Sequence, residues 1–273
     1  MTIERYAVIG NPIAHSRSPW IHAAFARQTG EAIVYDRILG PVGAFRETVE
    51  QFRAEGGRGL NVTLPFKLDA CAYATRTSER ATAAGAVNTL AFDGGEIVGD
   101  NTDGVGLVRD LERNLGLNLA GLRVLLLGAG GAAQGVVLPL LEREPAALVI
   151  ANRTLAKAEA LAQRFGRYGS VIAVAYPTLT DGDFDLVINA TASSLGAEAP
   201  PLPGGVYRAG STAYDMMYGK GETAFLRAAL SDGAAHLADG LGMLVEQAAE
   251  SFFIWRGRRP ETGPVLRELR ASL

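Results

Sequence analysis

The stretch "LLLGAGGAAQG", residues 125–135, joins a short aliphatic run to a glycine turn and to the start of an apolar helical pattern. Gly128, Gly130 and Ala133 have the spacing G-x-G-x-x-A. Glycines at such a strand-to-helix turn let backbone N–H groups approach a pyrophosphate closely, and the helix N-terminus adds partial positive charge. The stretch therefore predicts a dinucleotide-binding turn, with a turn used only for packing as the alternative.

The chain around and after this turn alternates between strand-like and helix-like patterns. From Leu122 the order is "RVLLLG", "AAQGVVLPLLERE", "ALVIANR", "AKAEALAQRFG", "SVIAVAY", "FDLVINAT" and "STAYDMMY". Such alternation is typical of a doubly wound α/β domain, in which ligands bind at the carboxyl ends of the parallel strands. We expect this Rossmann-type domain to cover residues 104–238.

The strand that follows the glycine turn bears on the choice of cofactor. An NAD site usually ends this strand with an Asp or Glu that binds the ribose 2′-hydroxyl. Here the strand ends with Asn152 and Arg153, followed by Thr154 and Lys157. Arg153 can pair with a 2′-phosphate and Lys157 adds a point charge, whereas an acid would repel this phosphate. The sequence therefore favours NADP over NAD, and a solvated basic loop is the alternative.

The first hundred residues show a second alternating series. Its segments are "RYAVIG", "SPWIHAAFARQTG", "IVYDRIL", "AFRETVEQFRAEG", "RGLNVTL", "KLDACAYA" and "AVNTLAFDGGEIVGDNTD", the last with a hairpin signal at Asp93, Gly94 and Gly95. Residues 240–256 have an amphipathic helical pattern, and we expect this helix to return to the first domain. The prediction is a mainly parallel α/β domain made of residues 1–103 and 239–273.

The segment "NVTLPFK", residues 61–67, has two contrasting faces. In an extended chain Asn61, Thr63, Pro65 and Lys67 share one face, opposite three apolar residues. The polar face suits the solvated side of an edge strand, which this segment alone favours, or a ligand site. Lys67 is one of three lysines among 26 basic residues. Because lysine can release its proton and arginine does not, Lys67 is a candidate for proton transfer.

Ser16 and Ser18, in "HSRSP", share a face of an extended chain at the start of a predicted helix. We expect Ser18 to cap this helix, Pro19 to occupy its first position and Gly30 to end it. Two hydroxyls beside a helix N-terminus can also hold a carboxylate without a buried cation. The pair is therefore a candidate carboxylate site, with a capping role alone for Ser18 as the alternative.

The composition argues against several classes of partner. A net charge of −3 gives no basic surface of the kind that binds nucleic acid or anionic membranes. The uncharged run at 124–141 is interrupted by glycines and Pro139, so we expect a buried strand, turn and helix there. Cys71 is the only cysteine, and neither it nor the three histidines have metal-ligand spacing. We therefore expect no metal site and a cytoplasmic protein that acts on a small molecule.

Nine motifs occur in a fixed order along nearly the whole chain. They are "GNPIAHSRSP", "NVTLPFK", "GAVNTL", "DNTDGVG", "GAGGAA", "NRT", "VINAT", "YDMMYGKGETAFL" and "DGLGMLVEQAAESFFIW". Together they resemble the shikimate dehydrogenase family of aromatic amino-acid biosynthesis. The resemblance implies a substrate-binding and catalytic domain of residues 1–103 and 239–273 and an NADP-binding Rossmann domain of residues 104–238. It also implies the NADP-dependent, reversible reduction of 3-dehydroshikimate to shikimate, on the route to chorismate.

The resemblance assigns a role to each matching residue. Lys67 and Asp103 match the catalytic pair. The groups that match the substrate contacts are Ser16, Ser18 and Tyr218 for the carboxylate, and Asn61, Thr63, Asn88, Asp103 and Gln247 for the ring hydroxyls. The groups that match the cofactor contacts are Gly128, Ala129, Gly130, Gly131, Ala132, Asn152, Arg153, Thr154 and Lys157 for the phosphates, and Met216, Gly240 and Met243 for the nicotinamide. By this assignment, the polar face of "NVTLPFK" points into a cleft between the domains.

Two other functions remain open at this point. One is an NAD-dependent quinate/shikimate dehydrogenase, which the basic residue Arg153 disfavours. The other is a sensor that binds NADP without catalysis, which the intact pair of Lys67 and Asp103 disfavours. The sequence leaves the oligomeric state open between monomer and homodimer.

Overall fold

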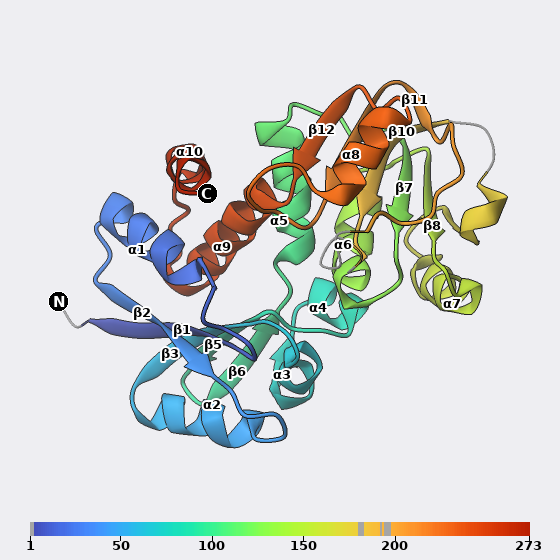
Figure 1. Cartoon of the computed structure of the whole chain (residues 1–273). Helices are drawn as coiled ribbons and strands as arrows, with labels where there is room; N and C mark the ends of the chain where they lie inside the picture. The colour runs from blue at the N-terminus through green and yellow to red at the C-terminus, as the bar shows by residue number, and fades with distance from the viewer. Residues whose placement is uncertain (1–2, 180–182, 192, 194–197) are drawn as a thin grey trace. The chain divides into compact units, whose positions relative to one another are not determined.

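The computed structural model describes residues 3–179, 183–191, 193 and 198–273 (Figure 1). Its contacts divide the chain into two compact units: unit 1 is Met1–Gly106 with Val245–Ala271, and unit 2 is Leu107–Leu244 with Ser272–Leu273. Each unit is built on its own six-stranded sheet. The sequence predicts a substrate-binding domain and an NADP-binding domain that meet at 103/104 and 238/239. These limits remain a prediction.

Unit 1 has a mixed sheet with the strand order β2-β1-β3-β5-β6-β4. The strands are β1 (Glu4–Gly10), β2 (Ile33–Leu39), β3 (Gly57–Val62), β4 (Arg76–Thr77), β5 (Thr89–Asp93) and β6 (Glu96–Asp100). β1 is parallel to β2 and β3, and β4 is parallel to β6, whereas β5 is antiparallel to both of its neighbours. Since β3 lies inside the sheet, the interpretation of "NVTLPFK" as part of an edge strand is wrong. Strand order depends on contacts between distant segments, which the local pattern does not contain.

The predicted hairpin is present in unit 1. Asp93 pairs with Glu96, so Gly94 and Gly95 form a two-residue turn between β5 and β6. Their φ angles are +52° and +101°, a region that glycine adopts without steric cost.

Helices cover both faces of the unit 1 sheet (Figure 1). They are α1 (Ser18–Thr29), α2 (Phe45–Ala54), α3 (Lys67–Tyr73), α4 (Glu79–Ala84), the greater part of α9 (Leu241–Arg256) and α10 (Thr262–Ala271). On one face, Phe52 of α2 and Ala70 of α3 pack with Leu60 of β3 in a buried core. On the other face, Trp255 of α9 stacks on Tyr6 of β1 with 4.7 Å between the ring centroids. The predicted helix at 240–256 thus forms and supplies part of this second core.

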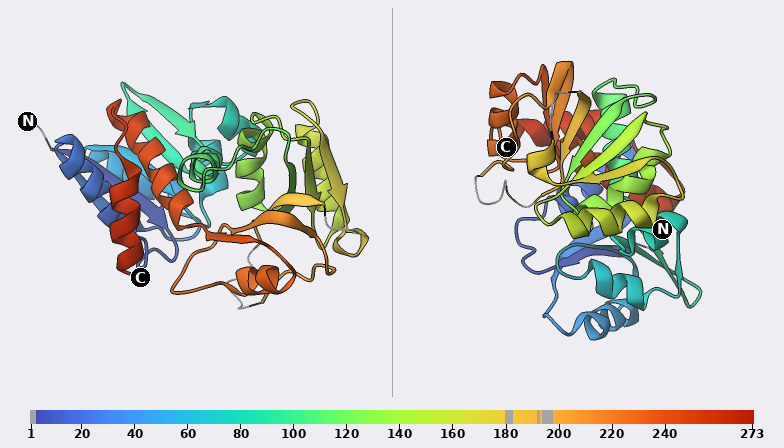
Figure 2. Two further views of the ribbon diagram at one scale, coloured as in Figure 1. Left: turned by 90° about the horizontal axis from the view of Figure 1, so that it is seen from above. Right: turned by 90° about the vertical axis from the view of Figure 1, so that its right-hand side faces the viewer.

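Unit 2 is a doubly wound domain with an entirely parallel sheet in the order β12-β11-β10-β7-β8-β9. Its strands are β7 (Arg123–Leu127), β8 (Ala147–Ala151), β9 (Val171–Val174), β10 (Phe184–Asn189), β11 (Tyr207–Asp215) and β12 (His236–Asp239). Its helical segments are η1 (Asp110–Asn114), α6 (Gly131–Leu141), α7 (Leu155–Phe165), η2 (Tyr176–Thr178) and α8 (Ala224–Ser231). Figure 2 shows α7 packed beside β8 and β9 from two further directions.

These two sheets with flanking helices confirm the fold class that the sequence predicts. The uncharged run at 124–141 forms β7, the glycine turn and α6, all largely buried. In the described parts of the chain, no helix is both long and apolar enough to cross a membrane. Helix α5 (Asp103–Arg109) begins in unit 1 and ends in unit 2.

Candidate active site

Lys67 and Asp103 form an ion pair in unit 1. β3 ends at Val62, residues 63–66 form a turn, and Lys67 is the first residue of α3. Asp103 is the first residue of α5, shortly after β6. The Nζ atom of Lys67 donates to Oδ2 of Asp103 at 2.5 Å, and the side chains are 24% and 12% exposed. A partly exposed ammonium held by a carboxylate is suited to exchanging a proton with a ligand.

Asn88 holds the second oxygen of this carboxylate. Its Nδ2 atom donates to Oδ1 of Asp103 at 2.8 Å and to Oγ1 of Thr102 at 2.9 Å. Its Oδ1 atom accepts from the backbone N–H of Thr102 at 2.9 Å. Because a backbone N–H can only donate, the amide oxygen must face it, and the NH₂ group must face Asp103. The buried Asn88 therefore holds the carboxylate of Asp103 in this orientation.

Asn61, the first polar residue of "NVTLPFK", is buried and uses its whole amide group inside unit 1. Its Oδ1 atom accepts from the hydroxyl of Tyr35 at 2.7 Å. Its Nδ2 atom lies near three acceptors: the carbonyl of Asn88 at 3.3 Å, Thr89 Oγ1 at 3.1 Å and Ser251 Oγ at 2.9 Å. Thr63 lies beyond the end of β3 and is partly exposed. The strand thus ends before the alternation of "NVTLPFK" is complete.

Gln247 comes to this group from α9. Its Oε1 atom accepts a hydrogen bond from Thr102 Oγ1 at 3.3 Å. Thr102 is adjacent to Asp103 and shares Asn88 with it. Asn88, Asp103 and Gln247, which are far apart in the sequence, are therefore brought together within unit 1.

Ser16 and Ser18 lie at the start of α1, but Ser18 is not the cap. The helix begins at Ser18, one residue earlier than predicted, so Arg17 occupies the cap position and makes no side-chain capping bond. Ser16 Oγ accepts from the backbone N–H of Ser18 at 3.3 Å, and Pro19 is the second residue of the helix instead of the predicted first. The predicted cap is therefore wrong by one residue, because the hydroxyl of Ser16 takes up this helix N–H. Gly30 ends the helix with a φ of +70°, as predicted.

The glycine turn of unit 2 has the form expected of a dinucleotide-binding turn. Gly128 has a φ of +101°, and a side chain there would come within 3.2 Å of the carbonyl oxygen of Ala190. At Gly130 and Gly131, by contrast, no atom of the described residues lies within 4 Å of the position that a side chain would occupy. Ala129 is buried and Ala132 is exposed at the start of α6. The described part of the chain therefore leaves room beside Gly130 and Gly131 at the N-terminus of α6, where helix N–H groups can bind an anion.

The loop after β8 presents two cations to solvent. Asn152 Nδ2 donates to the carbonyl of Thr154 at 2.8 Å and closes the loop in front of α7. Arg153, Thr154 and Lys157 are all exposed. Among the residues that the structure describes, neither Arg153 nor Lys157 has an ion-pair partner, so both charges are available to an anion.

The predicted nicotinamide contacts lie on either side of β12 in the sequence. A side chain at Gly240 would come within 2.2 Å of the carbonyl oxygen of Met216, so only glycine fits there. The N–H of Gly240 donates to the carbonyl of Met217 at 3.0 Å. Met243 is buried in the first turn of α9, and Tyr218 follows β11 with its side chain partly buried. Unit 2 therefore brings Met216 and Gly240 into contact.

The predicted site residues fall into two groups. Unit 1 carries Ser16, Ser18, Asn61, Thr63, Lys67, Asn88, Asp103 and Gln247, and unit 2 carries Tyr218 and all of the predicted cofactor contacts. It remains a prediction that the two groups meet across a cleft. It also remains a prediction that Tyr218 lies beside Ser16 and Ser18.

Comparisons with known proteins identify the family of the chain. The model of the shikimate dehydrogenase substrate binding domain matches residues 8–90, that of shikimate/quinate 5-dehydrogenase residues 110–196, and that of the shikimate 5′-dehydrogenase C-terminal domain residues 240–270. A curated relative from Nitrosospira multiformis, named shikimate dehydrogenase (NADP(+)), is 62% identical over 98% of either chain. The chain belongs to the shikimate dehydrogenase family.

Two solved structures extend this family likeness to three dimensions. The Ael1 enzyme from Pseudomonas putida is 52% identical and has a TM-score of 0.93 over 97% of this chain and 98% of its own. The shikimate 5-dehydrogenase from Thermus thermophilus, solved in complex with NADP(H) and shikimate, is 34% identical with a TM-score of 0.87. That match covers 99% of this chain and 100% of the other. The family and fold predicted from the sequence are both confirmed.

Sequence reasoning missed the residues that form hydrogen bonds to the predicted site residues Ser16 and Asn61. Arg37 of β2 donates through Nη2 and Nε to the carbonyl of Ser16 at 2.6 and 3.1 Å, which fixes the loop before α1. Tyr35, Thr89 and Ser251 surround Asn61. The available signal was the occurrence of polar residues within apolar patterns, such as Tyr35 and Arg37 in "IVYDRIL".

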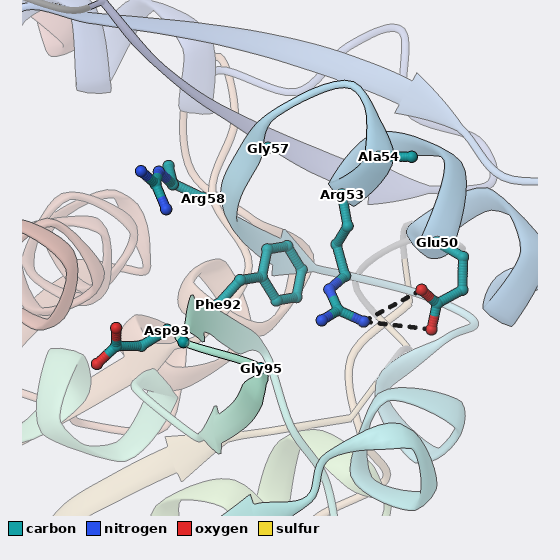
Figure 3. A pocket seen from close by; sticks show the side chains of 9 residues that line it. Glu50, Arg53, Ala54, Gly57, Arg58, Phe92, Asp93 and Gly95 are labelled. Carbon is teal, nitrogen blue, oxygen red and sulfur yellow. Dashed lines mark hydrogen bonds and ion pairs between the residues drawn. The ribbon is translucent and has the colours of Figure 1, made fainter.

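A cavity of about 380 Å³ opens elsewhere on unit 1 (Figure 3). It lies between α2 and the β5–β6 hairpin, and none of the predicted site residues lines it. Arg53 points into it, but its guanidinium is paired with Glu50 at 3.1 Å and lies over the ring of Phe92. Within the described residues, no three His, Cys, Asp or Glu side chains are grouped to hold a metal ion.

Proposed function

We propose that the chain catalyses the NADP-dependent, reversible reduction of 3-dehydroshikimate to shikimate, a step on the route to chorismate and the aromatic amino acids. The observation that carries the proposal is the 2.5 Å contact between Lys67 and Asp103, with Asn88 on the second carboxylate oxygen. The predicted enzyme class and NADP dependence are confirmed by curated relatives at 62% and 60% identity, which are named shikimate dehydrogenase (NADP(+)).

Lys67 supplies the proton that the reaction needs. Bound NADPH supplies a hydride to the ring carbonyl carbon, which leaves negative charge on the carbonyl oxygen. The ammonium of Lys67 stabilises this charge and donates a proton to it, and the product is a hydroxyl group. In the reverse direction, neutral Lys67 accepts the proton. Asp103 keeps the amine in place in both directions.

The residues of unit 2 fit NADP. The backbone N–H groups of the 128–132 turn would hold the pyrophosphate in the open space at the start of α6. Arg153 and Lys157 would hold the 2′-phosphate, and the residue that follows β8 is Asn152 instead of an acid. Met216, Gly240 and Met243 would line the nicotinamide.

The residues of unit 1 fit a polar, carboxylated ring. Ser16 and Ser18 would hold the carboxylate together with Tyr218, and Thr63 and Gln247 would contact the ring hydroxyls. Asn61 and Asn88 already use their amide groups inside the chain. Asn88 would therefore bind a ring hydroxyl only by exchanging an internal hydrogen bond, whereas Oδ1 of Asn61, which accepts from Tyr35, has a second lone pair for a ring hydroxyl.

A four-way assay tests the proposal. The purified protein is mixed with shikimate or quinate and with NADP⁺ or NAD⁺, and the absorbance of reduced nicotinamide is followed. We expect the highest kcat/KM for shikimate with NADP⁺. A higher value for quinate with NAD⁺ would support the quinate/shikimate alternative. Tight NADP⁺ binding without turnover of either substrate would support the sensor.

We further propose that this reaction takes place in the cytoplasm, on a monomer or a homodimer. The single cysteine supports a reducing compartment. Light scattering on the purified protein and fractionation of cells would test the two statements.

A further inference from the structure

Tyr35 of β2 lies behind the predicted substrate site and is not among its residues. Its ring stacks on His22 with 4.2 Å between the centroids and 5° between the planes. His22 is fully buried, and its ring nitrogens have no hydrogen-bond partner within the described part of the chain. The hydroxyl of Tyr35 reaches Oδ1 of Asn61 at 2.7 Å. This contact is also buried, so the hydrogen bond is not exchanged for water.

The direction of this hydrogen bond is fixed by its surroundings. Nδ2 of Asn61 faces the backbone carbonyl of Asn88, which can only accept. The amide oxygen of Asn61 must therefore point the other way, and Tyr35 must be the donor. Without that donor, the amide would lose the 2.7 Å contact that sets its orientation.

From Asn61 the hydrogen bonds continue without a gap to the catalytic pair. Asn61 Nδ2 lies 3.1 Å from Thr89 Oγ1, and Thr89 Oγ1 donates to Asn88 Oδ1 at 2.9 Å. Asn88 Nδ2 then donates to Asp103, which binds Lys67. Asn61, Asn88, Thr89 and Asp103 are all buried. A change of amide orientation at Asn61 therefore has a direct path to the carboxylate of Asp103.

We propose that Tyr35 is a positioning residue for the reaction: its hydroxyl, acting through Asn61, Thr89 and Asn88, sets the arrangement of Asp103 and Lys67. The inference deepens the proposed function and rests on it. Tyr35 does not touch the reacting atoms, so its contribution should appear in kcat and should vanish when Lys67 is absent.

The test begins with Tyr35→Phe, which keeps the ring on His22 and removes only the hydroxyl. Loss of one buried hydrogen bond should lower kcat for shikimate oxidation by about five- to tenfold and leave the KM for NADP⁺ within about twofold. In the Lys67→Ala background, the same substitution should change kcat by less than about twofold, because the group that it positions is gone.

Tyr6→Phe is the matched control. Tyr6 lies on the neighbouring strand β1, is buried, and stacks on Trp255 in the same apolar cluster. Its hydroxyl donates to Glu4 at 2.9 Å, away from the network of Asn61. Tyr6→Phe should lower the melting temperature by an amount similar to Tyr35→Phe while leaving kcat unchanged.

A measurement that does not depend on turnover separates the positioning role of Tyr35 from the proposed shikimate dehydrogenase activity. The chain has only three lysines, so protein labelled with ¹³C-lysine gives three side-chain Cε–Hε signals, and Lys67→Ala identifies the one from Lys67. Tyr35→Phe should shift the Lys67 signal, and Tyr6→Phe should not.

The outcomes are distinct. A shifted signal in a protein without shikimate activity would overturn the proposed function and leave Tyr35 as the positioning residue of this pair. An unshifted signal, a kcat equal to that of Tyr6→Phe, or an undiminished effect in the Lys67→Ala background would each overturn the inference.

Discussion

Replacing Asp103 with Asn tests how the ion pair works. The substitution keeps the shape of the side chain but turns one carboxylate oxygen into an NH₂ group. In the unsubstituted protein, Oδ2 of Asp103 accepts from Lys67 at 2.5 Å, and Oδ1 accepts from Asn88 at 2.8 Å. Whichever way the new amide turns, its NH₂ group faces another donor, because neither the ammonium form of Lys67 nor the NH₂ group of Asn88 can accept.

The size of the effect follows from the bond that is lost. A hydrogen bond to a charged group contributes about 1.5–3 kcal/mol, and the new amide cannot replace the charge on Asp103. If this free energy is expressed in the transition state, kcat/KM for shikimate should fall by about 10- to 150-fold. The assay is initial-rate NADP⁺ reduction, with circular dichroism melting to check the fold.

Asp100→Asn provides a control of similar environment. Asp100 pairs with Arg80 at 2.7 Å, and the two side chains are 14% and 21% exposed, close to the values of the Lys67 pair. Its loss should lower stability and leave kcat/KM within about twofold, since Arg80 is not in the site. The reasoning is refuted if Asp103→Asn retains more than half of the wild-type kcat/KM, or if Asp100→Asn loses as much activity.

Further predictions concern proton transfer, cofactor choice and stability. Lys67→Arg should lower kcat about a hundredfold with little change in the KM for shikimate, because guanidinium does not release its proton; near wild-type turnover in initial-rate assays would exclude proton transfer by Lys67. Arg153→Ala should raise the KM for NADP⁺ about tenfold and leave that for NAD⁺ unchanged, and equal changes in both would exclude a 2′-phosphate contact. Tyr214 is fully buried and donates to Asp110 at 2.6 Å, so Tyr214→Phe should lower the free energy of unfolding in urea by about 2 kcal/mol, whereas the surface variant Tyr168→Phe should not. Burial lowers the pKa of His22 from 6.5 to about 3, so between these values the unfolded chain binds more protons and stability falls as the pH falls. His22→Phe should make that decline shallower in urea titrations at pH 5 and 6.5, and an unchanged slope would contradict it.

Local patterns in the sequence were sufficient for most of the fold. The G-x-G-x-x-A spacing located the turn between β7 and α6, and Gly94 with Gly95 located the hairpin. Each of these features depends on residues within a few positions of one another, and each requires glycine for a stated conformational reason. The pair of Lys67 and Asp103 came from the family motifs, and the structure brings the two side chains into contact.

The features that were missed depend on distant contacts. The position of β3 inside the sheet is set by its pairing with β1 and β5, so the solvated-edge interpretation had no local evidence against it. The hydrogen bonds of Asn61 to Tyr35 and Ser251 join residues 26 and 190 positions apart. The error at Ser18 is different, because serine is a favourable cap by residue type and only the path of the backbone places Arg17 at the cap position instead.

The loop from Asn152 to Lys157 has a practical consequence. Its two cations project from the domain without helping to hold it together, so evolution or a protein engineer can exchange them at little risk to folding. If these two cations bind the 2′-phosphate as proposed, substitutions in this short surface segment would shift the preference toward NAD⁺ without altering Lys67 or Asp103.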